Sequence, residues 1–191
     1  MGDPRRVRKK FQTPSHPWQK ERIEKEHTLT KEYGLKNKRE LWKMASIARS
    51  FTTQAKRLSV LNTPQARKEE KQVLTRLQHY GWIKPNATLD DVLGLTVNSI
   101  LERRLQTLVF KKNLAKSIDQ ARQFIVHRHI LVGKRKITVP SYLVPLAEET
   151  AITFAENSKL QNPEHPERKV MEKASASVGS AEEKKQSEAP A

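Results

Sequence analysis

The sequence predicts a mainly α-helical protein with a small β part, an α+β fold with an N-terminal helical domain and a compact helix–helix–hairpin module. Three observations support this class. Apolar residues recur at steps of three and four between residues 41 and 125. Short β-rich runs occur near residues 130 and 138. Capping residues, prolines and glycines separate the helical segments.

The helical domain is expected over residues 18–95. A first helix from Trp18 to Tyr33 should end at Gly34, because glycine suits the position after a helix C-cap. A second helix of about 20 residues should bury one apolar stripe. That stripe is Leu41, Met44, Ala45, Ala48, Phe51, Ala55 and Leu58.

Two more helices complete this domain. Thr63 as N-cap and Pro64 at the first position predict a helix that stops before Gly81. Thr88 and Asp91 form a variant of the capping box, which predicts a short helix through residues 92–93.

The module over residues 96–156 is expected to begin with one helix. Its apolar face is Val97, Ile100, Leu101, Leu105 and Leu108. Arg103 and Arg104 lie beside that face, so we expect both to point outward. Ser117 and Gln120 then form a capping box for a second helix, with Ile118, Ala121 and Ile125 on its apolar side.

A hairpin should follow the helix pair. Residues 130–132 and 137–139 are rich in β-branched residues, and the turn Gly133-Lys134-Arg135-Lys136 between them is cationic. Pro140 should end the second strand or place it at an edge.

Charge indicates the class of partner. The chain has 37 Lys and Arg against 21 Asp and Glu, a net charge of +16, which favours a polyanion, and nucleic acid above a membrane surface. Residues 100–140 alone hold ten cations against two anions. Residues 158–191 hold six of each and few large apolar side chains, so we expect a disordered tail over residues 157–191.

Several classes of protein and site are disfavoured. The absence of cysteine excludes a disulfide framework, a thiolate zinc site and a cysteine nucleophile. Neither a signal peptide nor a run of about 18 apolar residues occurs, so an intracellular, cytoplasmic protein is expected. No Walker loop, G-x-S-x-G or H-E-x-x-H motif occurs, and the adjacent Asp90 and Asp91 cannot face each other on a helix. We therefore expect no enzyme, no cofactor and no metal.

Candidate RNA-binding residues lie in both halves of the chain. The arm over residues 1–17 should become ordered only against a polyanion; its cations are Arg5, Arg6, Arg8, Lys9 and Lys10. A second surface is predicted at Lys43, Arg49, Lys56 and Arg57. Trp18, Trp42 and Trp82 could stack on bases, but packing is favoured for the last two. For His127 and His129, RNA contact or packing is favoured over a metal site.

Motifs in the second half resemble a known family. Leu101-Glu102-Arg103-Arg104-Leu105, Ala115-Lys116-Ser117, Ala121-Arg122-Gln123, His127-Arg128-His129-Ile130 and Pro140-Ser141-Tyr142 resemble, in order and spacing, the S-four RNA-binding domain. This domain occurs in ribosomal protein S-four and in several RNA-modifying enzymes. Segments 2–6, 13–18, 33–42 and 103–107 are similar to the archaeal branch of the ribosomal proteins. The resemblance covers residues 2–156, and Arg128 stands where bacterial members usually have glycine.

The resemblance implies a set of residues that hold folded ribosomal RNA. These are Arg103, Arg104, Lys116, Ser117, Gln120, Arg122, Gln123, His127, Arg128 and His129. Lys134, Arg135 and Lys136 extend this set by position. It also implies a structural component of the small ribosomal subunit that binds a multi-helix junction, supports early assembly and translational accuracy, and lies near ribosomal protein S-five and the messenger RNA entry path. An RNA-modifying enzyme or a ribosome-associated RNA chaperone with an S-four module remains the alternative.

Overall fold

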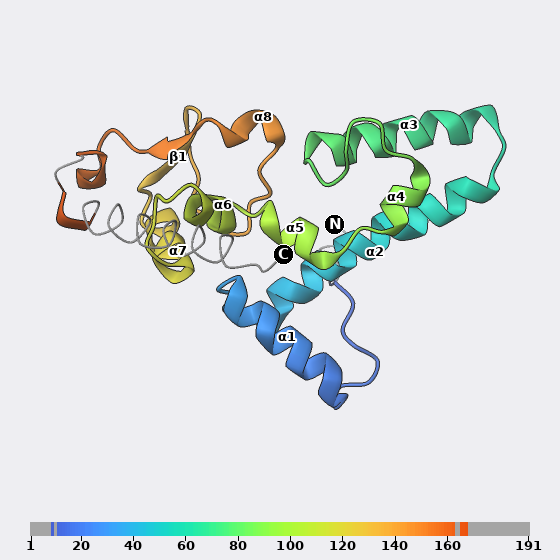
Figure 1. Cartoon of the computed structure of the whole chain (residues 1–191), viewed down its shortest axis with the longest axis horizontal. Coiled ribbons are helices and arrows are strands. Elements are labelled where there is room, and N and C mark those ends of the chain that lie inside the picture. The colour runs from blue at the N-terminus through green and yellow to red at the C-terminus, as the bar shows by residue number, and fades with distance from the viewer. Residues whose placement is uncertain (1–8, 10, 163–164, 168–191) are drawn as a thin grey trace, which may run out of the picture. The chain divides into compact units, whose positions relative to one another are not determined.

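The chain forms two compact units that divide between Leu101 and Glu102. The structure, a computed structural model, describes residues 9, 11–162 and 165–167 (Figure 1). In the first unit, α1 (Lys20–Glu32), α2 (Lys38–Val60), α3 (Pro64–His79) and α4 (Leu89–Leu93) follow one another along the chain. The long α2 contacts each of the other three helices. Among the described residues, no helix has the length and apolar character to cross a membrane.

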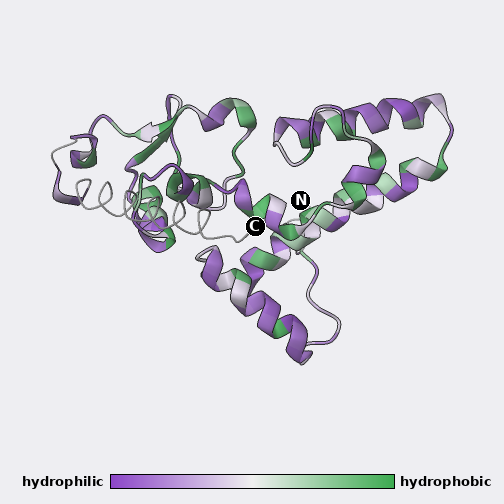
Figure 2. Ribbon diagram, in the orientation of Figure 1, coloured by the Kyte–Doolittle hydropathy of each residue, from purple (hydrophilic) through white to green (hydrophobic). Residues whose placement is uncertain are grey.

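The predicted apolar stripe of α2 is confirmed as the centre of the first unit. Six of its members are buried, namely Leu41, Met44, Ala48, Phe51, Ala55 and Leu58. Ala45 is half-buried at the edge of the stripe. Figure 2 shows that hydrophilic residues dominate α1 and α3. These two helices pack on α2 and consist largely of hydrophilic residues.

A buried carboxylate links α1 to α2. Glu26 of α1 is only 7% exposed. It accepts a hydrogen bond from Arg22 Nη1 at 2.6 Å and another from Trp42 Nε1 at 3.1 Å. Lys38 Nζ lies 3.6 Å from the other carboxylate oxygen. Packing of Trp42, expected from the sequence, is thus confirmed.

Glycines end α1 and α3 as predicted. Gly34 and Gly81 have positive φ values of 55° and 69°. After α1, the Leu35 N–H donates to Thr30 O at 2.9 Å, and after α3, the Trp82 N–H donates to Leu77 O at 3.1 Å. Both are Schellman motifs, in which a left-handed residue satisfies the last carbonyls of the helix.

Side-chain caps begin α3 and α4 as expected. Thr63 Oγ1 accepts from the Ala66 N–H at 3.2 Å, with Pro64 as the first residue of α3. The Thr88 N–H donates to Asp91 Oδ2 at 2.8 Å. Asp91 is thereby used in a helix cap.

The second unit packs two helices against a small antiparallel sheet. Its elements are α6 (Leu105–Lys111), α7 (Ile118–Val126), β1 (Ile130–Val132), β2 (Arg135–Lys136), α8 (Leu146–Glu149), β3 (Ile152–Phe154) and the 3-10 helix η1 (Lys159–Gln161). The strand order is β2-β1-β3, and Val132 pairs with Arg135 on one side and Ile152 on the other. The core includes Leu105, Val109, Ala121, Ile125, Ile130 and Val144.

The single helix predicted across residues 97–108 is wrong. Two short helices occupy this stretch, α5 (Val97–Glu102) and α6, because Arg104 between them is extended with φ −70° and ψ 142°. Here the backbone pairs with a distant strand-like segment. The Val144 N–H donates to Arg103 O at 3.0 Å, and the Leu105 N–H donates to Tyr142 O at 2.8 Å.

The hairpin is confirmed at the predicted place, but its turn is shorter and its second strand begins earlier than predicted. The turn is only Gly133-Lys134, with Gly133 at φ 60°, so β2 consists of Arg135 and Lys136 rather than residues 137–139. The third strand, β3, was not predicted from the sequence.

The beginning of the expected disordered tail is ordered. Residues 159–161 form η1, and the Leu160 side chain is 6% exposed. Its packing into the core of the second unit accounts for this order. Of the predicted tail, residues 163–164 and 168–191 lie outside the described residues.

Candidate nucleic-acid interface

The start of α7 presents polar groups that are held by a helix cap. Ser117 Oγ accepts from the Gln120 N–H at 3.2 Å, as predicted. Gln120 Oε1 accepts from the Lys116 N–H at 2.7 Å, one residue farther back than the capping box requires. Gln120 Nε2 donates to Glu167 Oε2 at 2.9 Å. Capping therefore fixes Gln120, while the Lys116 side chain is exposed.

The end of α7 presents an exposed cation in an unusual backbone conformation. Arg128 has φ 65°, and its N–H donates to Ile125 O at 3.1 Å. The His129 N–H donates to Phe124 O at 2.9 Å, so this is again a Schellman motif. A left-handed conformation costs an L-residue with a side chain roughly 1–2 kcal/mol. The geometry explains why glycine is suited to this position, and His127 and Arg128 are both exposed.

The two histidines beside Arg128 differ in environment. His129 is half-buried, its Nδ1 lies 2.9 Å from Ser158 Oγ, and its ring meets Phe124 edge-on at 6.0 Å between centroids. Of the two alternatives predicted for this histidine, RNA contact or packing, the structure shows packing for His129. Within the described residues, no group of three or more His, Asp or Glu could hold a metal ion.

Arg122 and Gln123 lie between these two ends of α7. Gln123 is exposed, whereas Arg122 is half-buried with Nη1 3.5 Å from Gln106 Oε1. The exposed members of the predicted set on α7 and its flanks are thus Lys116, Ser117, Gln123, His127 and Arg128.

The expectation that Arg103 and Arg104 point outward is wrong. Arg104 is fully buried, and the Arg103 side chain is 11% exposed. Arg103 Nη1 lies 2.6 Å from Glu149 Oε2, and its Nη2 donates to Val144 O at 3.0 Å. The break between α5 and α6 is the physical reason, because it removes both residues from the helical face on which they were placed.

Two carboxylates of α8 balance part of the positive charge of this unit. Besides Arg103–Glu149, Arg135 Nη2 lies 2.8 Å from Glu148 Oε1, and the Tyr142 hydroxyl donates to Glu148 Oε2 at 2.7 Å. Lys112 Nζ also donates to Glu149 O. No local sequence signal indicates this role, because the paired residues are 46 positions apart for Arg103 and Glu149 and 13 apart for Arg135 and Glu148. Lys134 and Lys136 are exposed and have no carboxylate partner in the described part of the chain.

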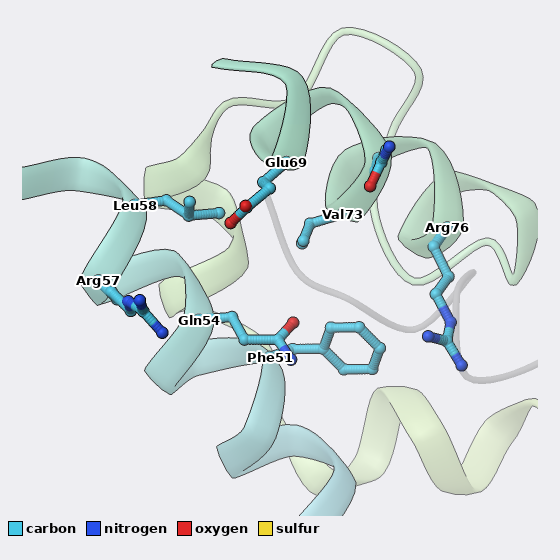
Figure 3. A pocket seen from close by; sticks show the side chains of 8 residues that line it. Phe51, Gln54, Arg57, Leu58, Glu69, Val73 and Arg76 are labelled. Carbon is cyan, nitrogen blue, oxygen red and sulfur yellow. The ribbon is translucent and has the colours of Figure 1, made fainter. Parts of the chain in front are cut away.

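The predicted cations of α2 are exposed but lie on different surfaces. Arg49 and Lys56 line a groove together with Lys9, Phe11 and Gln12. Arg57 lines a separate pocket between α2 and α3, of about 330 Å³, together with Glu69 and Arg76. Figure 3 shows the Glu69 carboxylate turned into that pocket. Lys43 lines neither, Lys9 is exposed, and Arg5, Arg6, Arg8 and Lys10 lie outside the described residues.

Two of the three tryptophans are packed. Trp82 is 9% exposed and stacks on Tyr80 with 4.7 Å between ring centroids, as expected for a core residue. Trp18, by contrast, is 91% exposed. Trp18 is therefore the tryptophan whose ring is accessible for stacking.

Comparison with known proteins identifies the family of the chain. The model of the S4 domain family matches residues 103–149, which lie in the second unit. The small ribosomal subunit protein uS4 of Methanococcus aeolicus is 54% identical over 169 residues, which are 88% of this chain and 96% of the relative. That of Methanococcus maripaludis is 51% identical over 88% of this chain and 95% of the relative. The resemblance to the archaeal branch is thereby confirmed, and the chain belongs to the uS4 family of small ribosomal subunit proteins.

Proposed function

We propose that this protein is a structural, non-enzymatic component of the small ribosomal subunit that binds ribosomal RNA. The observation that carries the proposal is 54% identity to a small ribosomal subunit protein over 88% of the chain. An alignment of that extent cannot be confined to one unit. It therefore favours a ribosomal protein over an RNA-modifying enzyme, in which only an S-four module would match.

The RNA-binding face of the second unit is assigned to its exposed cations and their polar neighbours. These are Lys116, Ser117, Gln123, His127, Arg128, Lys134 and Lys136. The deep, narrow major groove of an RNA helix excludes side chains, so recognition depends on phosphates, 2′-hydroxyls and shape. Cations fixed to a packed helix and a hairpin can neutralise crowded phosphates and hold RNA helices at a defined angle.

The remaining predicted residues receive supporting roles. Arg103 and Arg104 lie in the interior of the fold, so they shape the surface more than they touch RNA. Arg122, Gln120 and His129 are held by contacts within the protein. Arg135 is balanced by Glu148 and contributes less charge than Lys134 or Lys136.

The finer roles follow the family resemblance. The protein binds a multi-helix junction of ribosomal RNA early in assembly, in the cytoplasm. It contacts ribosomal protein S-five near the messenger RNA entry path and thereby contributes to translational accuracy. Membranes have no part in this role.

Salt dependence of RNA binding tests the mechanism. Six to ten phosphate contacts should lower the affinity of the full chain for small-subunit ribosomal RNA by about 10³–10⁵ between 50 and 200 mM salt. An affinity that hardly responds to salt would contradict the mechanism. Stoichiometric co-sedimentation with mature small subunits is also expected, whereas recovery only on large subunits would favour the chaperone alternative.

A further inference from the structure

We propose that the pocket between α2 and α3 is a docking site for a segment of another protein, one that carries aliphatic side chains flanked by carboxylates. This inference goes beyond the proposed RNA-binding role, because it assigns a protein partner to the first unit. The pocket has a volume of about 330 Å³. Ligand pockets range from about 300 to 1,000 Å³, so this one has room for a few side chains.

The middle of the pocket is apolar. Phe51 and Leu58 of α2 and Val73 of α3 line it. Phe51 and Leu58 are buried, and Val73 is half-buried. Figure 3 shows these three side chains between the two helices. An aliphatic side chain placed on them would exclude water from apolar surface, which is the dominant favourable term in most protein–protein association.

Two arginines flank this apolar surface. Figure 3 shows Arg57 and Arg76 at opposite ends of the pocket. Both are exposed, and neither forms an ion pair within the described part of the chain. Glu69 is the one acidic residue among those that line the pocket, and its Oε1 accepts from Gln65 Nε2 at 3.0 Å. The lining therefore has an excess of positive charge, and a guanidinium is suited to bind a carboxylate through two hydrogen bonds.

The same lining disfavours RNA as the occupant. The Arg76 guanidinium lies 5.8 Å from the centroid of the Phe51 ring, so a cation covers the one aromatic ring of the pocket. A nucleobase needs an open aromatic face on which to stack. Glu69 would repel a phosphate. We therefore assign Arg57, which the sequence placed on an RNA surface, to a protein contact.

Exposed apolar side chains lie close to the pocket. Val60 and Leu61, at the end of α2, are 79% and 41% exposed. They follow Leu58 by two and three residues, so they lie within about 10 Å of it along the chain. Apolar residues exposed together beside a pocket are typical of an interaction surface. A protein segment can cover them, whereas a sugar–phosphate backbone offers them no apolar partner.

A titration of the full chain with a defined peptide tests this site. The probe is the terminally blocked tetrapeptide Glu-Leu-Leu-Glu, whose two acids flank two leucines as the arginines flank the apolar surface. It should shift the backbone amide NMR signals of Gln54 and Val73, which line the pocket. The matched peptides Gln-Leu-Leu-Gln and Glu-Ser-Ser-Glu lack the charges or the apolar side chains, and each should bind about 5-fold more weakly or less.

Three variants of the full chain test the residues of the pocket. Arg57→Gln with Arg76→Gln should weaken binding of Glu-Leu-Leu-Glu by about 2–5-fold for each arginine. The control, Arg67→Gln with Lys68→Gln, removes two exposed cations of α3 that do not line the pocket and should leave the affinity within about 2-fold. Glu69→Gln should strengthen binding about 2-fold, because it removes a like charge. Circular dichroism checks that every variant is folded.

Several outcomes would overturn the assignment. The peptide might leave the amide signals of the pocket unchanged, or both double variants might weaken binding equally. A short oligouridylate that shifted these signals more than the peptide would identify RNA as the occupant. Self-association of the chain that the arginine variant abolished would identify a second copy instead. None of these results touches the proposed binding of ribosomal RNA, which the salt dependence tests separately.

Discussion

The two units carry positive charge in different ways. In the first unit, the helical one, Arg49 and Lys56 line a groove whose lining residues include no carboxylate. Within the described residues, neither cation is paired with an acidic group. In the second unit, which contains the S4 domain, the cationic stretch of residues 100–140 is partly neutralised inside the protein. Arg103 is paired with Glu149, Arg135 is paired with Glu148, and Arg104 is buried.

This difference shows that a high density of cations in a sequence does not mean that all of their charge is available to RNA. Residues 100–140 hold ten cations against two anions, yet the two carboxylates that balance Arg103 and Arg135 come from outside this stretch. An arginine in such a pair is a structural group, because its planar fork is already occupied by a carboxylate. The S4 unit therefore presents fewer free cations than its sequence suggests.

The largest effect is expected from reversing the buried charge. Arg104→Glu should lower the free energy of unfolding by about 3–5 kcal/mol, because it places an anion where the fold encloses a cation. Chemical denaturation followed by circular dichroism measures this change. The exposed Lys134→Glu is the control and should change stability by no more than about 0.5 kcal/mol.

If Arg104→Glu were as stable as the control while RNA binding were lost, Arg104 would be a surface contact. The contrast between the two units would then disappear.

A smaller effect is expected from the Arg103–Glu149 pair. The Arg103 side chain is 11% exposed and that of Glu149 is 33% exposed, so solvent screens the pair only in part. A double-mutant cycle with Arg103→Gln and Glu149→Gln should give a coupling energy of about 1 kcal/mol. The same cycle on the more exposed Arg135–Glu148 pair should give less, since the Arg135 side chain is 72% exposed.

Equal coupling energies in the two cycles would show that burial does not distinguish these pairs. A value near zero for both would mean that the carboxylates of α8 leave the arginines free for RNA.

Local signals explain what the sequence predicted correctly. The ends of α1 and α3 depend on Gly34 and Gly81, and the start of α3 depends on Thr63 and Pro64, all within a few residues of the helix they bound. The stripe of α2 was predictable because its apolar residues recur with the 3.6-residue period of an α-helix within one continuous segment. These features need no knowledge of distant parts of the chain.

Distant contacts explain what the sequence did not predict. The spacing of Leu101, Leu105 and Leu108 fits one continuous helix, but Arg104 is extended because the backbone near it pairs with residues 142–144. Likewise, β3 is held by antiparallel pairing with β1, a long-range contact that its own three residues do not indicate. In the candidate site, the motif resemblance identified Arg103, and the position of Arg135 in the turn added Arg135, but neither indicated that Glu149 and Glu148 are their partners.

The smallest change in stability is expected at Arg128, where stability and RNA binding should move in opposite directions. Arg128→Gly relieves the left-handed strain at φ 65°, part of which is offset by the greater freedom of glycine in the unfolded chain, so stability should rise by about 0.5–1 kcal/mol. The loss of the cation should reduce the salt slope of RNA binding by about 1. Asn113→Gly is the matched control, since Asn113 ends α6 with φ 56°, is exposed and has no charge; this variant should leave RNA binding unchanged. If Arg128→Gly stabilised the protein without weakening RNA binding, the strained conformation of Arg128 would serve no role in RNA binding. The end of α7 would then not be part of the proposed RNA-binding face.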